Sequence, residues 1–86
     1  MRKIANVNVL NSNAVRLMIF DKGKDGVFVF GYQSEKDSSC SWDCHYNHIE
    51  DAYEMGNEYG IQKEDWKVIP DSPDHCQDDW IDPVYL

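Results

Sequence analysis

The chain has 86 residues, of which 42% are hydrophobic and 13% aromatic, and its formal net charge is −8. This length leaves room for one hydrophobic core, so we expect a single domain over residues 1–86, and the apolar content argues against a disordered chain. Its three cysteines, an odd number, cannot form a closed set of disulfides, which favours reduced thiols and a cytoplasmic location.

The charge is unevenly distributed along the chain. Residues 1–36 carry six basic and three acidic side chains, a net charge of +3, whereas residues 37–86 carry two basic and thirteen acidic ones, a net charge of −11. The second half would repel a phosphate backbone, so we expect no nucleic-acid binding and favour a basic protein partner. Asn6 and Asn8 interrupt the apolar residues near the N-terminus, so we expect neither a signal peptide nor a membrane segment there.

The first half of the chain predicts three strands. Residues 3–10 alternate apolar and polar side chains, and turn-forming residues 11–13 separate them from the apolar run at 14–20, as is typical of a β-hairpin. A second turn leads to residues 27–32, which are apolar on both faces and therefore predict a strand covered on two sides. Residues 33–44 show no periodicity and are predicted to form a loop.

A helix is predicted to follow this loop. Asn47 has Glu50 three residues later, the spacing of a capping box, and Gly60 provides a residue that can end the helix in the left-handed conformation. One face of this helix is apolar, formed by Ile49, Ala52, Tyr53, Gly56 and Tyr59. The opposite face is polar, formed by Glu50, Asp51, Glu54, Asn57 and Glu58.

Residues 66–69 predict a fourth short strand, which Pro70 ends. The prolines beyond it preclude regular structure, yet this segment is too apolar for a free tail, so we expect an irregular C-terminal strap, anchored by Trp80, that packs back on the sheet. The predicted class is α+β. We expect a small antiparallel sheet of about four strands, in the order strand–strand–strand–helix–strand, with one helix packed on one face.

Cysteine and histidine side chains of the kind that bind zinc lie near the helix start. Cys40, Cys44 and His48, with Cys76 further along, form the candidate set for a metal site. They lack the repeated pair separated by two residues that is typical of structural zinc, so we expect no cofactor and keep zinc as an alternative. Because no nucleophile has a recognisable orienting group or oxyanion element, we do not expect an enzyme.

Aromatic residues among acidic ones are typical of protein interfaces. The expected interaction surface combines the loop with the acidic helix face and comprises Trp42, Asp43, Glu50, Asp51, Glu54 and Glu58. We therefore expect a small acidic, non-catalytic protein that binds a basic protein partner, similar in size and charge to inhibitor, immunity or adaptor proteins. Two alternatives stay open: a small zinc module built on the Cys/His set, and a structural subunit that forms a homodimer through the open edge of its sheet.

Overall fold

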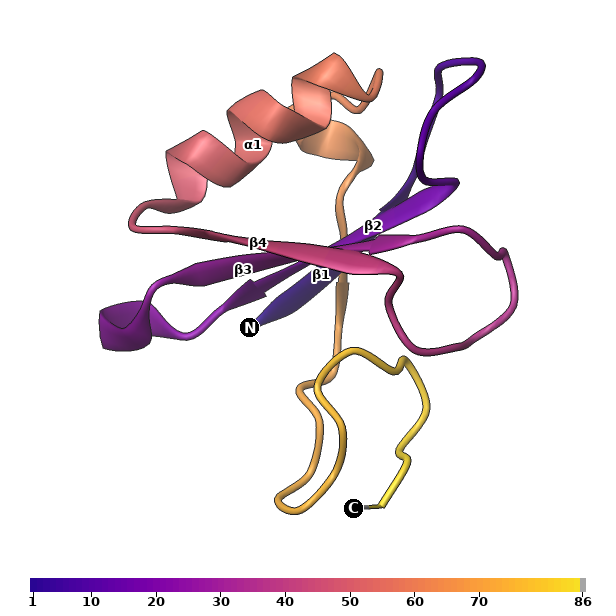
Figure 1. Cartoon of the computed structure of the whole chain (residues 1–86). Helices are drawn as coiled ribbons and strands as arrows, with labels where there is room; N and C mark the ends of the chain where they lie inside the picture. The colour runs from indigo at the N-terminus through magenta and orange to yellow at the C-terminus, as the bar shows by residue number, and fades with distance from the viewer. Residues whose placement is uncertain (86) are drawn as a thin grey trace.

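The computed structural model describes residues 1–85 and contains one antiparallel sheet and one α-helix (Figure 1). Its elements are β1 (Arg2–Asn6), β2 (Arg16–Asp21), β3 (Val27–Tyr32), β4 (Trp42–Tyr46), α1 (Ile49–Glu58) and β5 (Lys67–Ile69), with 3₁₀ turns at Gly23–Asp25 and Lys63–Asp65. The strands lie in the order β4-β3-β2-β1-β5, so β4 and β5 form the two edges of the sheet. The predicted α+β class is confirmed, and the sheet has five strands instead of about four.

Strand β4 is the element that the sequence prediction missed. The loop predicted over residues 33–44 ends earlier, and Trp42–Tyr46 pairs antiparallel with residues 27–31 of β3. Along β4, Trp42, Cys44 and Tyr46 are half-buried whereas the two residues between them are exposed. This period of two is that of a strand with one face in water.

Strand β1 ends four residues before the predicted limit at residue 10. Beyond Asn6, the Val7 N–H still donates to the carbonyl of Val15 over 2.9 Å, whereas the N–H of Asn8 donates to the carbonyl of Tyr59, at the end of α1, over 2.9 Å. Leu10, in the loop that follows, is 93% exposed.

The end of α1 is as predicted and its start is not. The N-cap residue is His48, and no side chain makes a cap hydrogen bond there in the described part of the chain, so the predicted capping box of Asn47 and Glu50 is wrong. At the other end Gly60 has φ +74°, its N–H donates to Asn57 over 3.0 Å, and the N–H of Ile61 donates to Gly56 over 3.0 Å. These two bonds form a Schellman motif, which confirms Gly60 as the terminating residue.

The sheet is covered on both faces (Figure 1). Helix α1 and the Trp66 ring cover one face, over a core that includes Leu17, Ile19 and Val29. Since neighbours on a strand point to opposite faces, Arg2, Met18 and Tyr32 belong to the other face.

The strap, residues 71–85, lies on this second face and is held by hydrogen bonds to its backbone carbonyls. The buried Arg2 guanidinium donates to Pro70, Asp78 and Trp80, and the Tyr32 hydroxyl donates to Asp79. Tyr32 is the β3 side chain with a hydrogen bond to the strap, whereas Phe28 and Phe30 on the same face are half-buried. The expected anchor was wrong, however: the strap is held by Arg2 rather than by the half-buried indole of Trp80, which donates to Gln77 of the strap itself over 3.1 Å.

Within residues 1–85, no helix combines the length and the apolar character that crossing a membrane requires.

Candidate functional site: an acidic groove between α1 and β4

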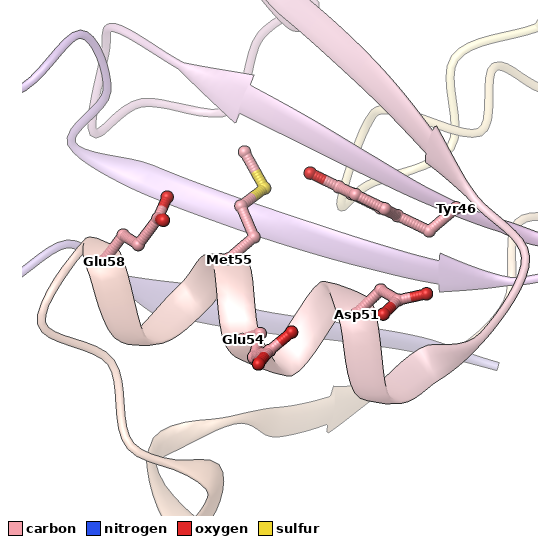
Figure 2. Close-up of a pocket in the computed structure, with 5 residues that line it drawn as sticks. All are labelled: Tyr46, Asp51, Glu54, Met55 and Glu58. Atoms are coloured by element: carbon pink, nitrogen blue, oxygen red, sulfur yellow. The ribbon is translucent and has the colours of Figure 1, made fainter.

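A groove with a volume of about 400 Å³ lies between α1 and the edge strand β4 (Figure 2). Its five lining residues are Tyr46, Asp51, Glu54, Met55 and Glu58. Figure 2 shows the phenol of Tyr46 reaching from β4 toward Met55, while three carboxylates project from α1. The groove thus combines an aromatic ring, a thioether and three acidic groups.

Helical spacing places the α1 side chains that line the groove on one flank of the helix. Asp51, Met55 and Glu58 occupy positions i, i+4 and i+7, which fall on one flank of a helix, and Glu54 lies one turn from both Asp51 and Glu58. Ala52 and Gly56, between them, are buried and fix this flank beside the sheet. On the other wall, alternation along β4 turns Tyr46 toward the helix side of the sheet.

The groove is negatively charged and has no basic side chain to balance it. The ion pairs among residues 1–85 are those of the N-terminal amine with Asp71 and of Lys22 with Asp78, so none involves Asp51, Glu54 or Glu58. The last turn of α1 carries no basic residue, and the negative end of the helix dipole adds to the charge of Glu58. Burial, followed by neighbouring Cys44 and Glu58, raises the pKa of the Tyr46 phenol above its ordinary value.

Three of the six residues expected to form the interaction surface gather in this groove: Asp51, Glu54 and Glu58. Glu50 does not line it, and the strand alternation turns Asp43 to the opposite face of the sheet from Trp42 and Cys44.

Trp42, which was expected in an irregular loop, packs within β4 against the core. A Cβ atom on Gly31 would lie 2.1 Å from its Cε2, its ring centroid is 6.0 Å from that of Tyr59, and its indole N–H donates to the carbonyl of Asn13 over 3.2 Å. These contacts give the indole a structural role at one end of the sheet.

Sequence reasoning missed Tyr46 and Met55. The signal for Tyr46 was the spacing of two residues between Trp42, Cys44 and Tyr46, which becomes readable once β4 is recognised as a strand. Met55 lies four residues after Asp51, beside the apolar stripe rather than in it, and the amphipathic pattern alone does not assign such a flanking position to either face.

The zinc candidates come from separate elements. Cys44 lies on β4, and His48 is the exposed N-cap of α1. The Cys40 backbone N–H donates to the Asp79 carboxylate over 2.8 Å, and Cys76 forms a β-bridge with Tyr85 within the strap. No group of three or more His, Cys, Asp or Glu side chains in residues 1–85 is placed to hold a metal ion.

No family model matches this chain, and neither a curated protein nor a solved structure is similar to it. What the protein does must therefore be inferred from the chemistry of its own surface.

Proposed function

We propose that this protein is a non-catalytic binding protein that recognises a basic segment of a partner protein in the groove between α1 and β4. The observation that carries the proposal is the composition of the groove: three carboxylates without an ion-pair partner in residues 1–85, beside an aromatic ring and a methionine.

The groove has a complementary group for each part of a lysine or arginine side chain. The aliphatic stem of such a residue can lie on Met55 and on the ring of Tyr46, and its charged end then reaches the carboxylates of Asp51, Glu54 or Glu58. A cation beside the Tyr46 ring gains a further cation–π attraction, on the order of 0.5–1 kcal/mol at an exposed site. The net charge of −8 steers a basic partner toward the protein and predicts an association rate that falls with salt.

The same residues are poorly suited to acid–base catalysis. A catalytic pair of carboxyl groups needs two environments that differ in burial, so that one group keeps its proton and the other loses it. Asp51, Glu54 and Glu58 are all exposed along one helix flank. We therefore propose binding rather than chemistry at this site.

The experiment is a titration of isotopically labelled protein with short peptides that carry two arginines, two glutamates or neither. We expect only the arginine peptide to shift the amide resonances of Tyr46, Asp51, Met55 and Glu58. The triple variant Asp51→Asn/Glu54→Gln/Glu58→Gln should lose this binding.

A matched control carries the same change in net charge outside the groove, at three exposed glutamates: Glu35→Gln/Glu50→Gln/Glu64→Gln. This control should retain binding. Equal losses in the two triple variants would show a diffuse charge effect and overturn the proposal, as would the absence of binding by any arginine peptide.

A further inference from the structure

We infer that the partner's basic segment binds as an additional β-strand along the open edge of β4, with alternate side chains entering the groove. This inference rests on the proposed function and adds how the backbone of the segment is held. Within residues 1–85, β4 pairs with β3 on one side only, so the backbone N–H and C=O groups that point away from β3 have no strand partner. Such an edge is a template for another strand.

The groove lies where a strand added to β4 would place its side chains. The added strand would run about 4.8 Å from β4, next to Tyr46 and below the flank of α1 that carries the carboxylates. Every second side chain of that strand would point toward α1, and two such side chains are roughly 6.6 Å apart. Asp51 and Glu58 are separated by seven residues, roughly 10 Å along a helix axis, with Glu54 between them. Two basic residues separated by one other residue, roughly 6.6 Å apart, therefore both fall within the span of the three carboxylates.

The other edge of the sheet is a poorer template. β5 has only three residues, and it begins with Lys67, a residue type that commonly protects an edge from pairing. β4 is longer and contains neither lysine nor proline. The absence of these blocking residues leaves β4 as the edge open to a partner.

Charge decides between a peptide and a second copy of this chain as the occupant of the edge. A dimer in which two β4 strands pair would bring the acidic flanks of two α1 helices to the same junction, and each protomer carries a net charge of −8. Like charges placed together disfavour that association. An extended basic segment instead supplies backbone partners for the edge and counter-charges for the groove.

The test uses a synthetic heptapeptide, Thr-Arg-Thr-Arg-Thr-Val-Thr, and two backbone-methylated forms of it. One form carries N-methyl groups on the amides of its two arginines. The other carries them on the amides of two threonines, the one between the arginines and the one directly after the second arginine. Charge and side chains stay the same in all three peptides. Because the amides of a strand point alternately to its two edges, only one methylation pattern blocks pairing with β4. We expect one methylated form to bind at least about tenfold more weakly than the parent peptide, and the other to bind about as well.

The second readout is amide hydrogen exchange in the protein. Binding of the parent peptide should slow exchange at the outward-pointing amides of Trp42–Tyr46, with cross-strand contacts between β4 and peptide protons.

The failures of the two proposals are distinguishable. Equal binding of the three peptides, lost in the groove triple variant, would retain the acidic groove and overturn strand addition. No binding by any of them would overturn both. A protein that has dimer mass in native mass spectrometry, with its β4 amides already protected, would assign the edge to a second copy and also overturn the inference.

Discussion

Arg2 and Pro70 are joined by two hydrogen bonds, from Nε and Nη2 of the guanidinium to one carbonyl oxygen, over 2.9 and 2.6 Å. The same side chain, only 2% exposed, also donates to the carbonyls of Asp78 and Trp80. A single residue of β1 therefore satisfies three backbone carbonyls at and beyond the end of β5. This arrangement closes the strap over the second face of the sheet.

The first prediction is that Arg2→Met strongly destabilises the protein. The substitution keeps an apolar side chain of similar length but removes the charged donor to three partly buried carbonyls, and each hydrogen bond to a charged group contributes about 1.5–3 kcal/mol. We expect a loss of roughly 3 kcal/mol or more in the free energy of unfolding, measured by urea denaturation.

The matched control is Arg16→Met, on the same face of the sheet. Arg16 is also buried, but its Nε and Nη2 have no hydrogen-bond partner in the described chain, and its guanidinium stacks 4.2 Å from the Tyr32 ring centroid. Removing a buried charge without a partner offsets the loss of stacking, so this variant should lie within about 1 kcal/mol of the parent. Equal costs for the two variants would contradict the assigned role of Arg2.

The second prediction separates backbone strain from a steric clash. Gly60 and Gly23 both have positive φ, +74° and +63°, so alanine at either position costs about 1–2 kcal/mol for its backbone conformation. A Cβ atom on Gly60 would also lie 2.7 Å from the carbonyl oxygen of Asn8, whereas nothing lies within 4 Å of a Cβ atom on Gly23. Gly60→Ala should therefore lower the urea midpoint clearly more than Gly23→Ala. If the two variants unfold together, Asn8 does not pack as tightly against the end of α1 as the structure indicates.

The third prediction concerns alkaline pH. Burial, followed by a hydrogen bond to Asp79 and the charge of Asp79, raises the pKa of the Cys40 thiol from its ordinary 9.0 to about 11. Burial and the charge of Asp79 likewise raise the pKa of the Tyr32 phenol. Both groups hold their protons more tightly in the folded state than in the unfolded state. Their stabilising contribution is therefore complete below about pH 9 and declines as the pH rises toward 11.

Urea unfolding at several pH values between 7 and 10.5 measures this decline. Cys40→Ser/Tyr32→Phe should show a shallower loss of stability above pH 9 than the parent protein. Tyr85→Phe, which removes a phenol from a residue 76% exposed, should leave the slope unchanged. If the free energy of unfolding of the double variant falls with pH as steeply as that of the parent protein, the alkaline transition belongs to other groups.

The fourth prediction is that a groove carboxylate costs stability. Glu58 lies in the last turn of α1 and four residues after Glu54, so it faces both the negative end of the helix dipole and a like charge. Glu58→Gln should raise the free energy of unfolding by about 0.5 kcal/mol at low ionic strength. Glu50→Gln, in the first turn, removes a favourable dipole interaction but also a like charge four residues before Glu54, so it should leave the free energy of unfolding nearly unchanged. Salt should diminish the gain from Glu58→Gln. A loss of stability in Glu58→Gln would instead assign this carboxylate a structural role.

The sequence predicted those parts of the fold in which apolar residues follow a clear pattern between turn-forming residues. Val27–Tyr32 was bounded correctly because turn residues flank an unbroken apolar run, and the end of α1 was correct because Gly60 is one of the few residues that adopt the left-handed conformation without strain. The sequence did not indicate β4, because an edge strand with one face in water needs only three side chains that point toward the core. The polar residues Asp43 and His45 between them made the segment read as a loop.

The tertiary contacts of the strap could not be predicted from hydrophobic periodicity, for a different reason. The strap is fixed by Arg2 through backbone carbonyls, which every residue has. Its carboxylate contacts come from Asp71, Asp78 and Asp79, which the sequence does not distinguish from the other acidic residues. One wall of the acidic groove could be predicted, because the helix period places Asp51, Glu54 and Glu58 on the polar side of α1. The sequence did not indicate which flank of α1 lies beside β4, because β4 itself was not predicted.

The tie between Arg2 and the strap also sets an order of events during biosynthesis. Arg2 leaves the ribosome 76 residues before Asp78 and 78 residues before Trp80, whose carbonyls accept its hydrogen bonds. Until then, the face of the sheet that carries Met18 and Tyr32 stays open to water or to a chaperone. The second face of the sheet is therefore closed only after Trp80 has emerged.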